Sequence, residues 1–202
     1  MDLKLKDKVI VVTGGSKGIG NGICNLLAKE GAIPVIIGRN KPNILDAVKA
    51  IKDNGGQAFH AFAELTDKEA CKKAIDDVIK EFGRIDGLVN NAGVNDGVGL
   101  ENGNYDDFMV SIQRNVAHYY AMAQFTLPEL KKSKGAIVNI GSKTSFTGQG
   151  GTSGYAAANG ARNALTREWA VELLPFSIRV NAVIVAECYT PLYKRWLDTF
   201  PN

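Results

Sequence analysis

Hydrophobic residues occur along the chain in short continuous runs and in longer segments with helical spacing. The runs predict strands covered on both faces, and the longer segments predict helices with one buried face. The predicted strands are Lys8–Thr13, Ile33–Ile37, Gln57–Ala63, Ile85–Val89, Ala136–Ile140 and Ile178–Val183. The predicted helices are Ile19–Glu30, Asn43–Lys52, Lys68–Phe82, Tyr105–Leu130 with a break near Asn115, and Ser153–Leu174.

The regular alternation of strand and helix predicts right-handed βαβ units and a parallel sheet with helices on both faces. We therefore expect a doubly wound α/β fold with six strands. No linker, repeat or low-complexity segment interrupts the pattern, so residues 1–202 are expected to form a single domain.

Composition narrows the class of protein. The chain has 202 residues, a net charge of +3 and 45% hydrophobic residues, which is ordinary for a globular protein. The basic residues are spread out, which argues against nucleic acid or a membrane as partner. The cysteines are Cys24, Cys71 and Cys188; they lack metal-ligand spacing and are expected to be buried thiols in a reducing compartment. Without a membrane-length apolar run or a signal-peptide core, we expect a cytoplasmic protein without a metal site.

A glycine-rich turn follows the first predicted strand, in the segment Thr13–Gly20 (TGGSKGIG). Glycines there let the backbone approach a pyrophosphate at the positive end of the next helix. Such a turn is a weak signal by itself, but its place after the first strand strengthens it. At the second strand, Gly38 cannot accept hydrogen bonds from a ribose 2′-hydroxyl, whereas Arg39, with Lys17, can neutralise a 2′-phosphate. This pair favours NADP over NAD; the alternative is two solvated surface cations.

Ser142 and Tyr155 form the candidate reaction centre. A serine ending a strand and a tyrosine on the next helix can meet at one substrate oxygen. A phenol titrates near pH 10, so a tyrosine that transfers protons at neutral pH needs a cation beside it. Position 159 is one helical turn further on the same face, and the chain has Asn159 there.

Together these segments resemble the short-chain dehydrogenase/reductase family. The matching segments are the TGGSKGIG turn, Asn90-Asn91-Ala92-Gly93, Asn115, Ser142, Tyr155 and Arg179-Val-Asn-Ala-Val, in the order of the family and over nearly the whole chain. The resemblance implies a Rossmann-type fold and hydride transfer with a nicotinamide cofactor. It also implies a dimer or tetramer, in which the helices around 105–130 and 153–174 pair with their copies.

The resemblance assigns roles position by position. Ser142 would hold the reacting oxygen, Tyr155 would pass the proton, and Asn115 would position a water. The family lysine, which binds the nicotinamide ribose and favours the ionised tyrosine, falls on Asn159. Cofactor contacts would come from Gly14, Ser16, Lys17, Gly18, Ile19, Gly20, Arg39, Glu64, Leu65, Asn90, Ala92, Gly93 and Thr190.

A narrower resemblance is to L-fucose dehydrogenases. It rests on segments such as Asn90-Asn-Ala-Gly-Val-Asn-Asp-Gly, His118-Tyr-Tyr-Ala-Met-Ala and Ala186-Glu-Cys-Tyr-Thr-Pro-Leu-Tyr. Polar side chains would surround the mouth of the pocket and suit a polyol, although some of them could merely solvate loops. The implied substrate residues are Asn95, Asp96, Lys143, Gln149, Glu187 and Tyr193.

Three departures from the family pattern bear on activity. Asn159 supplies none of the roughly 4 kcal/mol that a unit charge about 4 Å away provides at an effective dielectric near 20. Arg162 is on the same face as Tyr155 but about 10 Å along the helix axis, which we expect to be too far, and Lys143 would serve only if turned inward. The chain also ends before the family's last helix and seventh strand, and Val185 replaces a usual proline.

The two resemblances together imply a sugar dehydrogenase that oxidises an L-fucose-like aldose to a lactone with NADP, or with NAD. The competing hypothesis is a truncated, catalytically impaired pseudoenzyme that only binds nucleotide.

Overall fold

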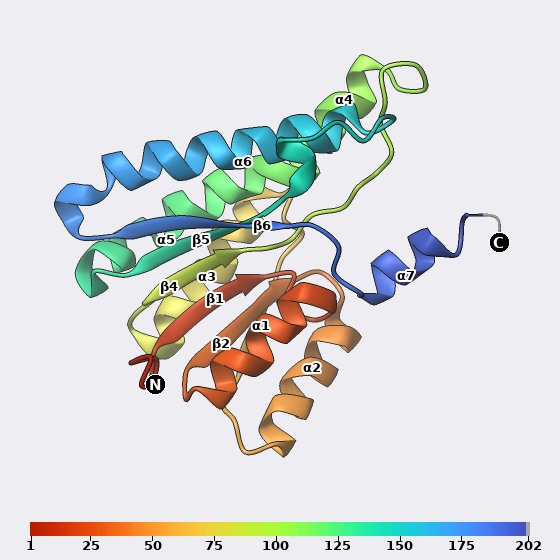
Figure 1. Cartoon of the computed structure of the whole chain (residues 1–202). Helices are drawn as coiled ribbons and strands as arrows, with labels where there is room; N and C mark the ends of the chain where they lie inside the picture. The colour runs from red at the N-terminus through yellow and green to blue at the C-terminus, as the bar shows by residue number, and fades with distance from the viewer. Residues whose placement is uncertain (201–202) are drawn as a thin grey trace.

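The computed structural model describes residues 1–200 and contains one parallel sheet of six strands. The strands lie in the order β3-β2-β1-β4-β5-β6, and all neighbours are parallel (Figure 1). Their bounds are β1 (Val9–Thr13), β2 (Ile33–Gly38), β3 (Phe59–Phe62), β4 (Gly87–Asn90), β5 (Ala136–Ser142) and β6 (Arg179–Val185). The doubly wound fold and its six strands are thereby confirmed. The order of the strands reverses at β1, where β4 lies on the opposite side from β2, and crevices at such points bind ligands in open α/β sheets.

The helices that connect the strands cover both faces of the sheet. They are α1 (Gly18–Lys29), α2 (Lys41–Asp53), α3 (Lys68–Phe82), α4 (Tyr105–Ile112), α5 (His118–Ser133), α6 (Ser153–Glu172) and α7 (Pro191–Leu197). Most expected helices agree within a few residues. The expected start of α2 was two residues late because Asn40 caps the helix by accepting from the Asn43 N–H, with Pro42 in the first turn. No helix in residues 1–200 is long and apolar enough to cross a membrane.

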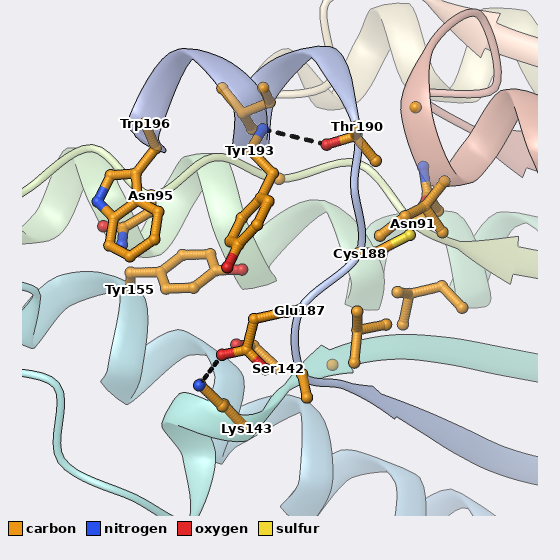
Figure 2. A pocket seen from close by; sticks show the side chains of 18 of the residues that line it. Asn91, Asn95, Ser142, Lys143, Tyr155, Glu187, Cys188, Thr190, Tyr193 and Trp196 are labelled. Carbon is orange, nitrogen blue, oxygen red and sulfur yellow. Dashed lines mark hydrogen bonds and ion pairs between the residues drawn. The ribbon is translucent and has the colours of Figure 1, made fainter. Parts of the chain in front are cut away.

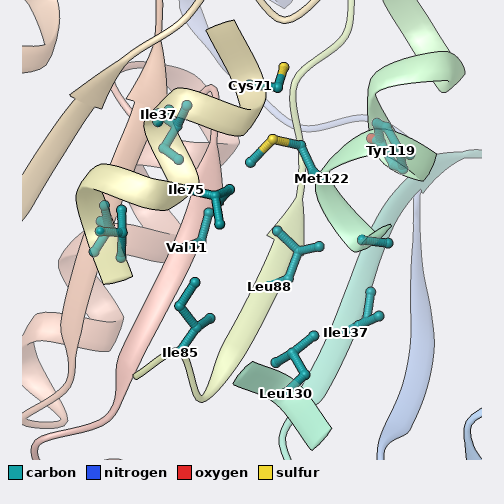
Figure 3. Packing of buried hydrophobic residues seen from close by; sticks show 14 of the residues in the cluster. Val11, Ile37, Cys71, Ile75, Ile85, Leu88, Tyr119, Met122, Leu130 and Ile137 are labelled. Carbon is teal, nitrogen blue, oxygen red and sulfur yellow. The ribbon is translucent and has the colours of Figure 1, made fainter. Parts of the chain in front are cut away.

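Successive strand residues point to opposite faces and build two separate cores. On one face, Val11, Ile37 and Leu88 pack against buried residues of α3 and α5, including Ile75 and Met122 (Figure 3). On the other face, a second set of strand residues packs against α1 and α2; it includes Ile10, Val12 and Ile36. Because both faces are covered, the central strands are apolar throughout, and this produced the continuous hydrophobic runs.

The expected break near Asn115 is a π-helical turn, Gln113–Ala117, between α4 and α5. Such turns contain one extra residue relative to an α-helix and occur often at functional sites. Asn115 is fully buried in this turn, and its side-chain oxygen accepts from the Val94 N–H at 2.8 Å. The turn thereby connects the helix to the loop that follows β4.

The C-terminal end contains one helix that was not predicted and one strand at the edge of the sheet. α7 was not foreseen; Thr190 caps it by accepting from the Tyr193 N–H at 3.2 Å, and Pro191 occupies its first turn. β6 is an edge strand of the described sheet, and its apolar Val183 is 51% exposed.

Asp86, in the turn before β4, fastens the start of β1. Its carboxylate accepts from the Val9 N–H at 3.0 Å, from Lys8 Nζ at 3.1 Å and from Arg84 Nε at 2.9 Å. Burial raises the pKa of Asp86, but the hydrogen bonds from Arg84, Val9 and Lys8 outweigh it and hold the pKa below the usual value.

Candidate active site

A cavity of about 1260 Å³ lies at the carboxyl ends of the strands. Its wall combines the turn after β1, the loop after β4, the end of β5, the first turns of α6 and the segment from Val185 to α7 (Figures 1 and 2). The carboxyl ends of parallel strands meet at one edge of a sheet, so residues far apart in the sequence converge there.

The glycine-rich turn forms the wall nearest α1. Gly14 and Gly18 have φ angles of +67° and +55°, in the left-handed region that glycine adopts without strain. Gly20 is pressed against the same turn, since a Cβ placed on it would lie 2.4 Å from the Gly14 carbonyl oxygen. This close packing brings the free N–H groups at the start of α1 to the cavity wall.

A hydrogen-bonded network fixes the glycine turn to the loop after β4. Thr13 Oγ1 accepts from the Asn91 and Ala92 N–H groups at 2.9 and 3.1 Å, and the Asn91 side chain donates to the Thr13 carbonyl at 2.9 Å. Asn90 points the other way, into the sheet, where its amide donates to Asn139 Oδ1 at 3.1 Å. Asn91 thus fastens the loop after β4 to the glycine turn, and Asn90 fastens β4 to β5 inside the sheet.

Ser142 and Tyr155 both lie on the cavity wall. Figure 2 shows the phenols of Tyr155 and Tyr193 pointing toward one region beside Ser142. Ser142 Oγ accepts from the Thr144 N–H at 3.3 Å, and neither the Ser142 nor the Tyr155 hydroxyl donates to another group in residues 1–200. Both O–H groups are therefore available to a molecule in the cavity.

Polar residues line the outer part of the cavity. Lys143 Nζ pairs with Glu187 Oε1 across it, which offsets the charge of the lysine (Figure 2). The other expected substrate residues on the wall are Asn95, Gln149 and Tyr193. Asp96 is elsewhere: its carboxylate accepts from Ser111 Oγ at 2.8 Å, behind the loop.

The side chain of Asn159 does not face the cavity. Asn159 is fully buried; its amide donates to the Tyr155 carbonyl at 2.9 Å, and its Oδ1 accepts from Arg162 Nη1 at 3.0 Å. Arg162 lines the cavity, and Asn159 does not. Axial distance alone therefore underestimated the reach of Arg162, because long helical side chains lean toward the helix N-terminus.

Nine of the expected cofactor residues lie on the wall: Gly14, Ser16, Lys17, Gly18, Ile19, Gly20, Ala92, Gly93 and Thr190. The other four expected cofactor residues do not line the cavity, and neither does Asn115. Leu65 packs against the core, and Arg39 Nη1 pairs with Glu64 Oε2 at 2.8 Å on the surface. Asn90 and Asn115 are buried behind the wall.

Sequence reasoning missed several wall residues and misjudged one cysteine. Trp196 and Arg195 line the cavity without having been singled out, and Asn91 lines it although it was named only as part of a matching segment, without a role. Cys188 was expected to be buried but is exposed on the cavity wall, because the segment after β6 is covered by no further element in the described chain. Burial raises the pKa of Cys24 to about 12, as expected for an inert core thiol.

The wall fits a nicotinamide dinucleotide. The left-handed glycines and the helix N-terminus suit the diphosphate, and Thr190 lies next to this turn, with its Cγ2 3.5 Å from a Cβ placed on Gly18. In residues 1–200 no three His, Cys, Asp or Glu side chains are grouped so that they could hold a metal ion.

Comparisons with known proteins identify the family of the chain. Residues 8–199 match the family model described as short chain dehydrogenase. The chain is 33% identical over 196 residues to cyclopentanol dehydrogenase from Comamonas sp. (strain NCIMB 9872), covering 96% of this chain and 78% of that protein. It is 29% identical over 203 residues to L-fucose dehydrogenase from Bos taurus, covering 100% of this chain and 74% of that protein.

Solved structures give the same result. A crystal structure of the Cj0485 dehydrogenase matches with a TM-score of 0.95 and 46% identity, covering 100% of this chain and 77% of that one. The structure of levodione reductase matches with a TM-score of 0.90 and 27% identity, covering 96% of this chain and 76% of that one. The chain belongs to the short-chain dehydrogenase family and is an NAD(P)-dependent oxidoreductase by that membership.

Proposed function

We propose that the protein oxidises a hydroxyl group of a polyhydroxylated substrate, an L-fucose-like aldose, with NADP as the favoured hydride acceptor. The observation that carries the proposal is the meeting of Ser142, Tyr155 and the glycine turn on one cavity. The cofactor would supply the hydride acceptor, and the protein would position the substrate and take up the proton.

The chemistry follows from two free hydroxyl groups. Ser142 would donate a hydrogen bond to the substrate oxygen, and Tyr155 in its ionised form would accept the proton from that oxygen. As the O–H bond breaks, the carbon–oxygen bond would become double, and a bound nicotinamide would supply the acceptor for the carbon-bound hydrogen and its electron pair. Oxidation at the anomeric carbon would yield a lactone and leave Tyr155 protonated, so that it must lose this proton before the next turnover.

The substrate class is argued from the outer wall of the cavity. Lys143, Glu187, Asn95 and Gln149 offer donors and acceptors to hydroxyl groups, and a site with such groups rejects analogues that lack them. The match to bovine L-fucose dehydrogenase supports a sugar. The match to cyclopentanol dehydrogenase makes a simple cyclic alcohol the natural comparison substrate.

NADP is favoured because Gly38 has no carboxylate for a ribose 2′-hydroxyl and Arg39 carries a cation beside it. The Arg39 guanidinium is paired with Glu64, so a 2′-phosphate would have to compete with this carboxylate. Both side chains are largely exposed, and such surface pairs contribute little, about 0.2–1 kcal/mol. The competition is therefore weak enough for a doubly charged phosphate to win.

The alternative is a nucleotide-binding protein without turnover, and Asn159 is the observation in its favour. A direct assay separates the two: reduction of NADP and NAD is followed by absorbance with L-fucose, other aldoses and cyclopentanol. We expect turnover with an aldose, and loss of at least about 10²-fold in Tyr155→Phe, since proton transfer by a positioned group is typically worth 10²–10⁴-fold. Tyr189→Phe, which removes an exposed phenol, is the matched control. Nucleotide binding without turnover of any substrate would establish the alternative.

The assembly that the family resemblance implies, a dimer or tetramer, would use the outer faces of α4, α5 and α6. Tyr105, Tyr120 and Val171 on these helices are 75%, 54% and 74% exposed, which leaves apolar surface for a second copy. Light scattering of the purified chain tests this; a stable monomer at micromolar concentration contradicts it.

A further inference from the structure

Arg162, in the middle of α6, is a buried cation. The residue is 3% exposed, and its guanidinium donates only to neutral oxygens. Nε donates to the Asn115 carbonyl at 2.7 Å, and Nη1 donates to the Ile140 carbonyl at 3.1 Å and to Asn159 Oδ1 at 3.0 Å. The guanidinium carbon also lies 4.3 Å from the centre of the Tyr119 ring.

Within the described part of the chain, no carboxylate pairs with this guanidinium. None of the ion pairs among residues 1–200 includes Arg162. Burying a cation without an anion is costly, and proteins retain such groups mainly where the charge has a use. Arg162 also reaches the cavity wall, so its charge acts on what lies in the cavity.

The charge lies at the helical turn that follows Tyr155. Nη1 contacts Asn159, whose amide in turn donates to the Tyr155 carbonyl at 2.9 Å. The arginine side chain thus spans back along α6 and presents its cation at the level of position 159. Arg162 and Tyr155 line the same cavity, and a cation in its wall favours a negative charge that develops on a phenol there.

We propose that the Arg162 guanidinium supplies the positive charge beside Tyr155 that the family resemblance assigns to a lysine at position 159. Asn159 is then the partner that orients the guanidinium, and Arg162 is a positioning residue that acts through the electrostatics of the site. The inference rests on the proposed function, in which Tyr155 transfers the proton.

Two neighbouring residues support this assignment. The Lys143 ammonium is paired with Glu187 at the outer wall, so its charge is offset. Gly93 leaves room for the guanidinium, because a Cβ at that position would lie 2.7 Å from Arg162 Nη2. The loop after β4 and the arginine are therefore fitted to each other.

The arrangement also implies that the site can hold either the Arg162 guanidinium or a lysine at position 159, but not both. Position 159 is fully buried against the guanidinium, so an added ammonium would meet a like charge in a dry environment. Asn159→Lys alone should therefore disturb the site, although it introduces the family residue. The same change should be tolerated once the arginine charge is removed.

Other ionisable groups around the guanidinium and the cavity must be kept constant in a test of pH dependence. They are His118 and Tyr119 on α5, Lys143 and Glu187 at the outer wall, Cys188 after β6, Tyr193 and Arg195 on α7, and Lys17 in the glycine turn.

The test compares Arg162→Gln, which keeps an amide donor but removes the charge, with Arg162→Lys, Asn159→Lys and the double variant Asn159→Lys/Arg162→Gln. Two pH midpoints are measured for each variant: the midpoint of the rate of aldose oxidation, and the midpoint of the tyrosinate absorbance band. In both measurements the signal of the same variant carrying Tyr155→Phe is subtracted, so that only Tyr155 contributes. We expect Arg162→Gln to lower turnover about 10-fold or more and to raise both midpoints by about one pH unit. Arg162→Lys and the double variant should return toward the parent values.

Thermal unfolding gives a readout that needs no turnover. Asn159→Lys alone should lower the unfolding temperature, and adding Arg162→Gln should raise it again, which is a non-additive effect of contacting residues. If Arg162→Gln does not fold, recovery of folding and midpoint in the double variant decides the question.

An unchanged tyrosinate midpoint in folded Arg162→Gln overturns the inference, as does a double variant that remains as impaired as Arg162→Gln. A parent protein that oxidises no substrate but shows the expected tyrosinate shift refutes the proposed function and leaves the role of Arg162 standing.

Discussion

Replacing Gly20 by alanine should weaken both the fold and the cofactor site, although alanine is the better helix former. A Cβ at position 20 would lie 2.4 Å from the Gly14 carbonyl oxygen and 2.5 Å from Asn91 Nδ2. The carbonyl belongs to backbone in a left-handed turn, and the amide is held by its bond to the Thr13 carbonyl. Neither neighbour can move away cheaply.

The magnitude follows from three opposing terms. Overpacking costs about 1–3 kcal/mol, and loss of the Asn91 hydrogen bond costs about 1 kcal/mol. The higher helix propensity of alanine returns about 1 kcal/mol, so Gly20→Ala should destabilise the protein by about 1–3 kcal/mol. Gly22 is the matched control: it lies in the same helix, and a Cβ there meets nothing within 4 Å. Gly22→Ala should therefore stabilise by up to about 1 kcal/mol.

Urea and thermal unfolding of the two variants measure this difference. A separation of about 1–4 kcal/mol corresponds to roughly 2–16 °C in unfolding temperature for a domain of this size. Fluorescence titration with NADPH should show at least about 10-fold weaker binding for Gly20→Ala and little change for Gly22→Ala. If both variants unfold together, or if Gly20→Ala binds NADPH normally, the packing argument for the glycine turn is wrong.

Three further outcomes test other parts of the structure. Glu64→Gln should free Arg39 for a 2′-phosphate and tighten NADPH binding by a few-fold over NADH; unchanged or tighter NADH binding would contradict the role of Arg39. Burial and the charge of Arg162 lower the pKa of His118 to about 4. Between pH 6.5 and 4 the histidine is therefore protonated in the unfolded chain but not in the folded one, and the free energy of unfolding should fall by up to about 3 kcal/mol over this range. His118→Phe should reduce this pH dependence in urea unfolding. Asp86→Asn should cost about 1–2 kcal/mol at pH 7, because the depressed pKa of the carboxylate contributes stability above the unfolded value near 4, and this cost should shrink as the pH falls below that value.

The sequence was sufficient for the fold because the strands are buried on both faces. Runs such as Lys8–Thr13 and Ile33–Ile37 alternate with helical segments of the length that a βαβ unit requires, so they are difficult to interpret as anything but buried strands. The strand ends were harder: β5 continues through Gly141 to Ser142, beyond its apolar run, and β6 continues to Val185, because the ladder pairs Gly141 with Ile184 and Ser142 with Val185. α7 has the signals of a cap at Thr190 and Pro191, but seven residues are too few for a periodic pattern to be recognised.

The candidate site was predictable to the extent that it depends on the order of motifs. Ser142, Tyr155 and the glycine turn meet because each follows a parallel strand. The pairing of Arg39 with Glu64 and the direction of Arg162 depend on side-chain conformations in three dimensions, which spacing along a helix does not reveal. Cys188 was assigned by the average behaviour of cysteine, and the local exposure of the segment after β6 overrides that average.

The single extra residue of the π-helical turn at Gln113–Ala117 lets one continuous helical segment serve two neighbours. Before the turn, α4 packs on α6; after it, α5 packs on α3. One residue more or less rotates the following helix by about 100° about its axis. Deleting a residue from the turn would swing Tyr119 and Met122 out of the core and move Asn115 away from the loop after β4. The irregular turn therefore sets the rotation of α5 about its axis relative to α4, so that one helical segment places one face in the core and another beside the cavity.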